Sequence, residues 1–588
     1  MMKLKKRIWI FLLLLIIGVL LLTIEWPTPK KLQPTKKGTE VSGLFSDLQT
    51  DKARYNPGEK VIFRLNTDYD PIKFQVSYFH LNKKLKTETI TNKHSWSWQP
   101  PEDDFKGYLV EVKMTEEKKV HTETIAVDVS SDWSRFPRYG FLSEFNEKSS
   151  QEMKNTIASL NRYHLNGIQF YDWHFEHQQP LKMDDGSPAP HWQDVANRDI
   201  SLQTIGQYIE LAHNHGMKAM AYNLLYGSFE NGGLPYEWHL FKDNERKEID
   251  QHPLPDQWKS NINIMNPTNP WWQDYIINQQ RMVYDHLSFD GWHIDQLGDR
   301  GEVFNEWGDT VSIADSFAPF LAKIKEQLPE KDIVMNAVNQ FGQKSISDAS
   351  PAFLYTEVWD EYKFYNDLKR ILDENLSLSD GAGSVLAAYM NYQLSDNPGE
   401  FNEPGILLAN SVIFANGGAH LELGEHMLSK EYFPHNQLKM PGTLEKQLIT
   451  YYDFLTAYEN LLRDQVKDSF VSLASQEGIP LSFNMPERNK LWIIPKEKDH
   501  RKILHFINFL DATSMEWRDT DGKQAKPAVR EDLRFTYKEA LMVKEIWLAS
   551  PDIQSGKAVS LDFNQKEGEI SFTLPSLSYW DMVVIEYE

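Results

Sequence analysis

Apolar and polar residues follow two different rhythms along the chain. Between about residues 133 and 425, short apolar runs alternate with longer stretches in which apolar residues recur every three to four positions. The runs predict buried strands, and the longer stretches predict amphipathic helices. The expected helices include 201–214, 271–286, 316–327 and 363–376, and eight strands are expected at 139–145, 167–173, 218–226, 291–297, 332–338, 353–359, 385–392 and 419–423.

Eight strand–helix repeats in series predict a closed parallel (α/β)8 barrel, a TIM barrel, over residues 133–479. A doubly wound open sheet would produce the same local pattern and is the alternative. In a barrel the carboxyl ends of all strands share one face. Polar residues at those ends are therefore the candidates for chemistry.

Short strand-like runs, alternating before this region and apolar after it, mark both flanks. Runs such as 61–65 indicate a small β-sandwich over residues 42–132, and runs such as 491–494 indicate an antiparallel β domain over 480–588. The chain is therefore expected to be multidomain, because 588 residues exceed what a single core usually organises.

The N-terminus has the pattern of an export signal. Basic residues within positions 3–7 precede an unbroken apolar run over 8–24, and no small-x-small cleavage site follows. We expect residues 1–26 to be an uncleaved membrane anchor and 27–41, rich in Pro, Lys and Thr, to be a linker. The folded part would then lie on the extracellular face of the membrane; a removed signal peptide and a secreted protein are the alternative.

Composition narrows the class of partner. Lys and Arg number 62 against 84 Asp and Glu, and the resulting net charge of -22 argues against nucleic acid or an anionic membrane surface. The 18 Trp residues suit a sugar-binding cleft, because the apolar face of a pyranose packs on an aromatic ring. The absence of Cys excludes disulfides and thiolate catalysis.

Two carboxylates are expected on the catalytic face of the barrel. Asp295 ends the fourth strand and Glu357 ends the sixth. Glycoside cleavage requires such a pair, one ionised group to attack the anomeric carbon and one protonated group to release the leaving oxygen. A separation of about 5 to 5.5 Å would indicate retention of configuration, and a wider gap inversion.

Further polar and aromatic residues stand at the other strand ends. We expect Asp172 to bind sugar hydroxyls, Tyr171 and Trp173 to stack on sugar rings, and His174 to lie beside them. A metal site built on His174 is disfavoured, because adjacent ligands on an extended strand face opposite sides. No metal or cofactor is expected, and the remaining candidates for substrate binding are Tyr222, Asn223, His293, Asn336, Trp359, Tyr389 and Asn391.

At these residues the chain resembles glycoside hydrolase family 66, which contains dextranases and cycloisomaltooligosaccharide glucanotransferases. The resemblance rests on segments 135–141, 161–174, 291–298 and 355–359. It implies an immunoglobulin-like sandwich before the barrel and a retaining double displacement without a metal. The family's nucleophile would correspond to Asp295, its acid/base to Glu357 and a further active-site acid to Asp172.

The two activities of that family differ in the group that accepts the glucosyl chain. The family's glucanotransferases carry a carbohydrate-binding module inserted in the barrel, and the connection from Tyr226 to Pro270 is too short for one. We therefore expect dextranase-like endo-hydrolysis of α-1,6-glucan or isomalto-oligosaccharides. Cyclising transfer is the alternative.

Two other classes of function fit the sequence less well. A non-catalytic, surface-tethered glucan-binding protein would have no need to keep both Asp295 and Glu357. An α-1,4-acting barrel hydrolase usually carries Arg two residues before its nucleophile, and this chain has His293 there. Both alternatives are disfavoured.

Overall fold

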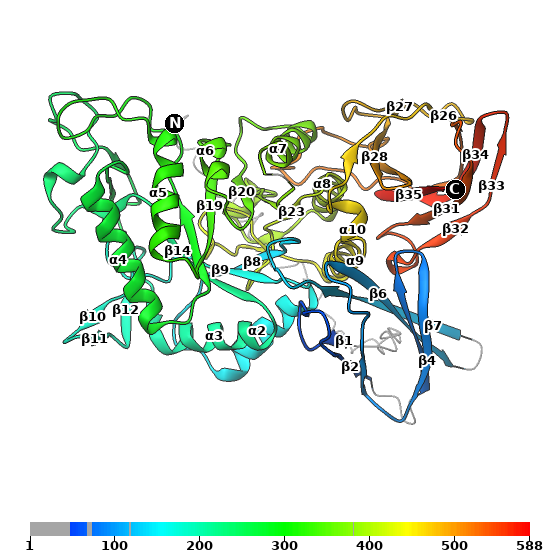
Figure 1. Ribbon diagram of the computed structural model, residues 1–588, viewed down its shortest axis with the longest axis horizontal. Coiled ribbons are helices and arrows are strands. Elements are labelled where there is room, and N and C mark those ends of the chain that lie inside the picture. Colours follow the sequence, from blue (N-terminus) through cyan, green and yellow to red (C-terminus); the bar gives the residue numbers. More distant parts are fainter. Residues whose placement is uncertain (1–46, 68–72, 117–118, 380) are drawn as a thin grey trace, which may run out of the picture. The chain divides into compact units, whose positions relative to one another are not determined.

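The computed structural model describes residues 47–588 except 68–72, 117–118 and 380 (Figure 1). Residues Asp47–Glu588 form one compact unit. The expected anchor over residues 1–26 and linker over 27–41 lie outside the described residues. Over the part that is described, no helix has both the length and the apolar character needed to cross a bilayer.

Eight parallel strands form the central sheet. In spatial order they are β8 (Tyr139–Leu142), β9 (Gly167–Phe170), β14 (Lys218–Leu224), β18 (Gly291–Asp295), β19 (Asp332–Val338), β20 (Leu354–Glu357), β21 (Ser384–Ala387) and β23 (Ala419–His420). A parallel bridge joins Phe141 of β8 to Gly424, and Phe141 N donates to Leu423 O at 3.2 Å. The sheet is a nearly closed barrel, so the open-sheet alternative is wrong.

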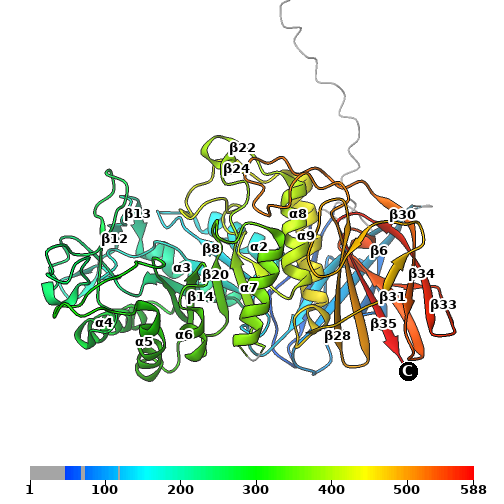
Figure 2. The same cartoon turned by 90° about the horizontal axis from the view of Figure 1, so that it is seen from above.

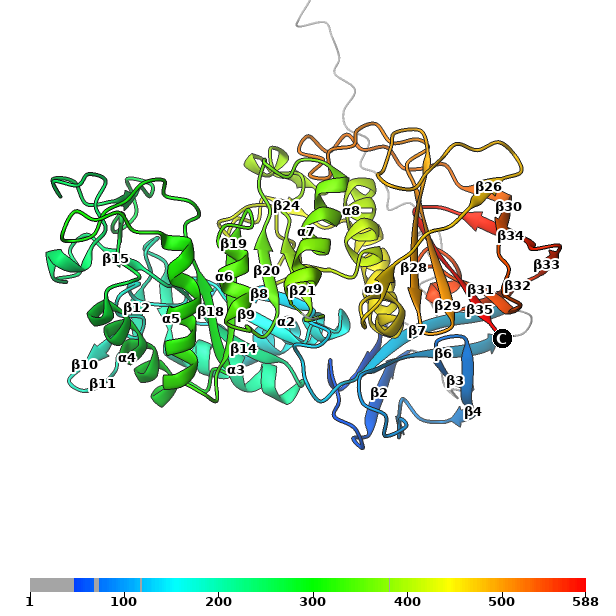
Figure 3. The same cartoon turned by 45° about the horizontal axis from the view of Figure 1, so that its top comes forward.

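Helices connect these strands and pack on the outside of the sheet (Figure 3). They are α2 (Ser150–Arg162), α3 (Leu202–Asn214), α4 (Pro270–His286), α5 (Ile313–Gln327), α6 (Gln343–Asp348), α7 (Tyr365–Leu378) and α8 (Glu403–Ala415). In α2 the buried residues Met153, Ile157 and Leu160 recur at helical spacing, and a capping box between Ser149 and Glu152 begins the helix. The spacing of the apolar residues and the N-terminal capping box therefore both favour a helix at this position.

Alternate strand residues fill the barrel. Tyr139, Met220, Val334, Tyr355 and Val385 are buried in one apolar cluster. Two residues further along several strands, the inward positions become polar: Tyr222 follows Met220, Asn336 follows Val334 and Glu357 follows Tyr355. The apolar filling thus supports a polar layer at the carboxyl ends of the strands.

Two sheets precede the barrel in the chain, and their strands all pair antiparallel. One consists of β1 (Asp47–Thr50), β2 (Val61–Asn66) and β5 (Ser95–Trp98). The other has the order β4 (Lys83–Thr91), β3 (Lys73–His80), β6 (Lys106–Glu116) and β7 (Lys119–Val129).

Helices α9 (Gly442–Ala457) and α10 (Glu459–Leu462) lead to two further sheets. The larger contains β25 (Lys467–Asp468), β27 (Leu481–Ser482), β28 (Leu491–Lys498), β29 (Arg501–Asn508), β35 (Trp580–Tyr587), β31 (Val543–Ala549) and β32 (Val559–Leu561), and the smaller contains β26 (Leu473–Ser475), β30 (Arg530–Lys538), β34 (Glu569–Leu577) and β33 (Phe563–Lys566). Their pairs are antiparallel except for β27 with β28. Strands β25 and β26 precede residue 480, the expected start of this region.

Polar and apolar contacts join these regions. Figure 2 shows α8 and α9 beside β28, and buried residues of both helices share one apolar cluster with Trp492 and Trp580. Ala126 N of β7 donates to Asp453 Oδ1 of α9 at 2.9 Å. Fully buried Arg138, just before β8, pairs with Asp128 of β7 at 2.5 Å.

The loops at the carboxyl ends of the barrel strands contain several short strands. After β9 come the pairs β10 (Met183–Asp184) with β11 (Ser187–Pro188) and β12 (His191–Gln193) with β13 (Asp199–Ser201). After β14 come β15 (Gly227–Phe229), β17 (Ile262–Ile264) and β16 (Gln251–His252) in one sheet. After β21, β22 (Gly399–Glu400) pairs with β24 (Leu438–Lys439). These loops form the walls of the candidate site.

Candidate active site

A cavity of about 710 Å³ opens at the carboxyl ends of the barrel strands. Its lining includes both expected catalytic residues and most of the expected substrate contacts. From the sequence-based candidates, the structure brings together Tyr171, Asp172, Tyr222, His293, Asp295, Asn336, Glu357, Trp359 and Tyr389.

Asp295 and Glu357 face each other across one amide. Asn336 of β19 donates from a single nitrogen to Asp295 Oδ1 at 2.8 Å and to Glu357 Oε2 at 3.0 Å. Those two oxygens are therefore less than about 6 Å apart, which is the range of retaining rather than inverting glycosidases. The side-chain oxygen Oδ1 of Asn336 accepts from Glu357 N at 3.2 Å, which fixes the orientation of the side-chain amide.

Asp295 is the better stabilised anion of the two. Burial raises the pKa of Asp295 above its usual value, and hydrogen bonds from Asn336, the Tyr222 hydroxyl and the backbone N–H of Gln296 limit that rise. The Tyr222 and Gln296 bonds are both 2.8 Å long. A carboxylate that accepts three hydrogen bonds is stabilised in its charged form.

Glu357 is the better proton holder. Desolvation, followed by the negative charge of Asp295, raises the pKa of Glu357 to about 7, against hydrogen bonds that include one from the Tyr389 hydroxyl at 2.7 Å. Two interacting carboxyl groups with unequal environments keep one proton between them. The environment places that proton on Glu357, which suits a general acid, and leaves Asp295 ionised, which suits a nucleophile.

Asp172 also lines the cavity, two residues beyond the end of β9. Its backbone has a φ of 50°, and the side chain is only 4% exposed. Burial raises the pKa of Asp172 to about 8, although the charge of Arg198 lowers it. A carboxyl group that is neutral at pH 7 can donate a hydrogen bond to a sugar oxygen as well as accept one.

Aromatic rings and one imidazole also line the cavity. Tyr171 stacks on Phe433 with ring centroids 4.2 Å apart, and His293 stacks under Tyr222 at 6.1 Å. Burial lowers the pKa of His293 to about 3, so its ring is neutral. Tyr139 contacts His293 Nδ1 at 3.2 Å and orients the ring.

The prediction that Trp173 stacks on sugar is wrong. Trp173 is fully buried, packs against Phe289 with ring centroids 5.2 Å apart, and donates its indole N–H to Tyr222 O at 3.1 Å. The left-handed backbone at Asp172 breaks the alternation of the strand. Asp172 therefore turns into the cavity while Trp173 turns into the core.

Three other expected substrate contacts do not line the cavity. His174 is fully buried. Asn223 exchanges hydrogen bonds with His177 at 3.0 and 2.8 Å, and so secures the loop after β9. Asn391 donates to Asp519 O at 2.6 Å, which connects the loop after β21 to the C-terminal region. Asn223 and Asn391 therefore support the loops around the cavity.

Two loops contribute residues that sequence patterns missed. Trp258 lies in the excursion after β14 and Tyr432 in the loop after β23, and their rings meet with centroids 5.0 Å apart at the cavity. Arg198 lies 5.7 Å from the Tyr432 ring. Single aromatic residues within polar, Pro-containing segments are the only sequence signal for such contacts, and they have no periodicity.

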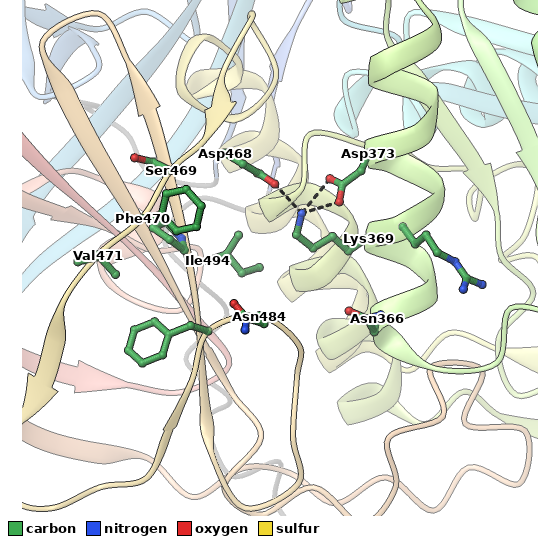
Figure 4. Close-up of a pocket in the computed structure, with 12 residues that line it drawn as sticks. Asn366, Lys369, Asp373, Asp468, Ser469, Phe470, Val471, Asn484 and Ile494 are labelled. Carbon is green, nitrogen blue, oxygen red and sulfur yellow. Dashed lines mark hydrogen bonds and ion pairs between the residues drawn. The ribbon is translucent and has the colours of Figure 1, made fainter.

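A second hollow, of about 410 Å³, lies between α7 and the strands β25 and β28 (Figure 4). Lys369 occupies its centre and pairs with Asp373 at 2.7 Å and Asp468 at 2.9 Å. Its cation is thus already balanced by two carboxylates. Among the described residues, no group of three or more His, Asp or Glu side chains is arranged to hold a metal ion.

Comparisons with known proteins agree with this geometry. The sequence model of glycosyl hydrolase family 66 matches residues 50–584. A cycloisomaltooligosaccharide glucanotransferase of Niallia circulans is 26% identical, over 99% of this chain and 75% of that protein. A dextranase of Streptococcus salivarius is 22% identical, over 82% of this chain and 67% of that protein.

One solved structure superposes closely. It is a cycloisomaltooligosaccharide glucanotransferase from Paenibacillus sp., complexed with cycloisomaltoheptaose, with a TM-score of 0.86 and 25% identity. The match covers 92% of this chain and 99% of that chain.

Proposed function

The chain belongs to glycosyl hydrolase family 66, and we propose that its cavity is the active site of a dextranase-like enzyme that hydrolyses internal α-1,6-glucosidic linkages. The observation that carries this function is the amide of Asn336 shared by Asp295 and Glu357. It supports this function because it holds two carboxyl groups with unequal environments at less than about 6 Å, a separation that suits a retaining glycosidase.

The first half of the reaction forms a covalent intermediate. Asp295 Oδ attacks the anomeric carbon, and Glu357 gives its proton to the glycosidic oxygen as that bond breaks. The leaving chain departs with a new 6-hydroxyl group. Asp295 then carries a glucosyl ester, and Glu357 is ionised.

The second half restores the enzyme. Glu357 takes a proton from water, the water oxygen attacks the anomeric carbon, and the ester bond to Asp295 breaks. Two displacements at one carbon retain its configuration. Both carboxyl groups return to their starting states.

The cavity has aromatic surface on both sides of the cleavage point, which supports internal cleavage. The leaving chain must lie on the side of Glu357, where Trp359 lines the wall. The glucosyl chain must lie on the side of Asp172, where Trp258 and Tyr432 meet. Sugar units can therefore stack on either side of the bond that is cut.

Cyclising transfer is the second candidate, because two of the related proteins are cycloisomaltooligosaccharide glucanotransferases. In that reaction the far end of the bound chain supplies the attacking 6-hydroxyl in place of water. The excursion after β14 supports hydrolysis. It folds into the three short strands β15, β16 and β17 rather than into an inserted module.

We also propose the domain arrangement that the sequence predicts. Residues 42–132 would be an immunoglobulin-like sandwich, 133–479 the catalytic barrel and 480–588 an antiparallel β domain, and the antiparallel sheets on both flanks support this division. The apolar run over 8–24 supports an anchored enzyme on the extracellular face of the membrane.

Trapping the intermediate tests this mechanism. An isomaltosyl fluoride with a second fluorine on the sugar ring reacts with the nucleophile and hydrolyses slowly. Mass spectrometry of the digested enzyme should find one glycosyl group on the peptide that contains Asp295. The adduct should be lost in Asp295→Asn and kept in Asp299→Asn, whose exposed carboxylate lies four residues away. An adduct on a different residue would show that Asp295 is not the nucleophile.

A further inference from the structure

The loop between β29 and β30 crosses from the C-terminal sheets onto the rim of the barrel. Glu516 in this loop forms an antiparallel bridge with Phe364, and the indole N–H of Trp517 donates to Tyr362 O at 2.6 Å. The loop is therefore held against the segment that follows β20, the strand that ends in Glu357.

Arg518 extends from this loop to the surroundings of the acid/base. It is 9% exposed, and its guanidinium donates to Val358 O at 3.0 Å and to Tyr389 O at 3.2 Å. Val358 follows Glu357 in the chain, and the Tyr389 hydroxyl donates to Glu357 Oε1 at 2.7 Å. One planar group thus joins the two chain segments that determine where the Glu357 carboxyl lies.

The same guanidinium lies against the aromatic rim. It is 5.6 Å from the ring centroid of Trp359, 5.4 Å from that of Tyr392 and 4.8 Å from that of Trp517. Trp359 is half-buried and lines the cavity on the leaving-chain side. Arg518 therefore contacts a ring that is available to sugar as well as the backbone beside the acid/base.

Folding stability alone does not explain a cation at this position. Burial lowers the pKa of Arg518, which shows that its charge is poorly solvated. Its carboxylate partner, Asp360, is 3.7 Å away, and the Asp360 side chain is 93% exposed. Such a pair compensates little of the desolvation cost.

We propose that Arg518 is a positioning residue for Glu357, supplied to the barrel by the C-terminal region. It bonds to the carbonyls of Val358 and Tyr389 at once, and so keeps the acid/base and its tyrosine donor in register with the glycosidic oxygen. This inference rests on the proposed function, because it assigns Arg518 to the proton-transfer half of that mechanism.

Two substrates separate positioning from general damage. An isomalto-oligosaccharide needs a proton on its leaving oxygen, whereas the first turnover of fluoride release from isomaltosyl fluoride does not. In Arg518→Met we expect kcat for the oligosaccharide to fall about 10- to 100-fold, as for a displaced catalytic group. First-turnover fluoride release should stay close to that of the unaltered enzyme. Arg518→Lys should be intermediate, because Lys keeps the charge but not the planar pair of donors.

The pH profile is the readout that a merely structural role would not move. The Tyr389 hydrogen bond lowers the pKa of Glu357. If that bond loosens in Arg518→Met, the alkaline limb of kcat/KM should move to higher pH. Arg530→Met is the matched control, because Arg530 pairs with Asp511 near the ends of the same loop at 2.8 Å and does not reach the cavity.

The outcomes are distinct. An equal loss on both substrates with an unmoved alkaline limb would overturn the positioning role, and so would full activity of Arg518→Met. Unfolding midpoints of all variants would show whether a loss follows stability instead. An unaltered enzyme that releases neither sugar nor fluoride would overturn the proposed function and this inference with it.

Discussion

Asp295 and Glu357 occupy one cavity and share one amide, yet their environments favour different protonation states. Asp295 also accepts from Tyr222 and from a backbone N–H, whereas Glu357 is desolvated beside an existing negative charge. In the proposed mechanism the acid/base and the nucleophile are therefore distinguished by their neighbours rather than by their own chemistry.

The pH dependence of activity follows from this difference. The proposed mechanism requires Asp295 ionised and Glu357 protonated, and the pKa of Glu357 is raised to about 7. We expect kcat/KM for an isomalto-oligosaccharide to fall as the pH rises through about 7, because the proton on Glu357 is then lost. In Glu357→Gln, kcat should be lower by about 10²- to 10⁴-fold.

Isomaltosyl fluoride provides the control for that prediction. Its leaving group needs no proton, so first-turnover fluoride release by Glu357→Gln should remain fast and lack the alkaline limb. Glu361→Gln, an exposed carboxylate four residues away, should leave both the rate and the limb unchanged. If the rate of Glu357→Gln on isomaltosyl fluoride still fell at alkaline pH, a group other than Glu357 would be responsible for the titration.

Both carboxylates could be located from the sequence because each follows a strongly apolar strand. In a barrel, the residue at the end of such a strand must lie on the face where the loops meet. The sequence could not place Trp173, because the left-handed φ at Asp172 that reverses the side-chain order has no sequence pattern of its own. It also missed Arg518, which is more than a hundred residues from Glu357 in the chain and reaches it only through tertiary structure.

At the scale of elements, the eight strands appear where apolar runs predict them, but most end earlier. The strand expected over 167–173 ends at Phe170, and the one expected over 385–392 ends at Ala387. The residues beyond these ends point into the cavity or bond to loops, as Asn391 N does to Arg518 O at 2.9 Å. The apolar pattern of the sequence therefore continues beyond the last residue that pairs in the sheet. The strands of two or three residues in the loops have no periodicity to detect.

Closure of the barrel depends on the absence of a side chain at Gly424. A Cβ atom there would lie 2.5 Å from Phe141 O, so the backbone of β8 would have to move. We expect Gly424→Ala to lower the free energy of unfolding by about 1 to 3 kcal/mol, as for other overpacked sites. The midpoint of urea denaturation measures this change.

Gly206 in α3 is the matched control. A Cβ atom at Gly206 would meet nothing within 4 Å, so Gly206→Ala should raise the free energy of unfolding by about 0.5 to 1 kcal/mol through helix propensity. Equal midpoints for Gly424→Ala and Gly206→Ala would contradict the close approach at the barrel seam.

At the scale of the whole molecule, buried polar groups connect regions that are distant in the chain. Asp453 of α9 accepts from Ala126 N of β7 and pairs with Arg162 of α2 at 3.0 Å. Alternation patterns predict β-rich flanks and a central barrel, and the described residues form sheets in these regions. The alternation patterns cannot predict which flanking residue reaches the barrel, because such contacts have no signal in the local sequence.

The reaction of residues 40–588 with dextran tests the central claim most directly. Residues 40–588 should release linear isomalto-oligosaccharides. The average molecular mass of the dextran should fall early in the reaction, because internal cleavage shortens every chain. Asp295→Asn should release none and Glu357→Gln about 10²- to 10⁴-fold less, while Asp299→Asn and Glu361→Gln should act like the unaltered chain. Cyclic products would move the assignment to glucanotransferase. Dextran that is bound but never shortened would contradict the account.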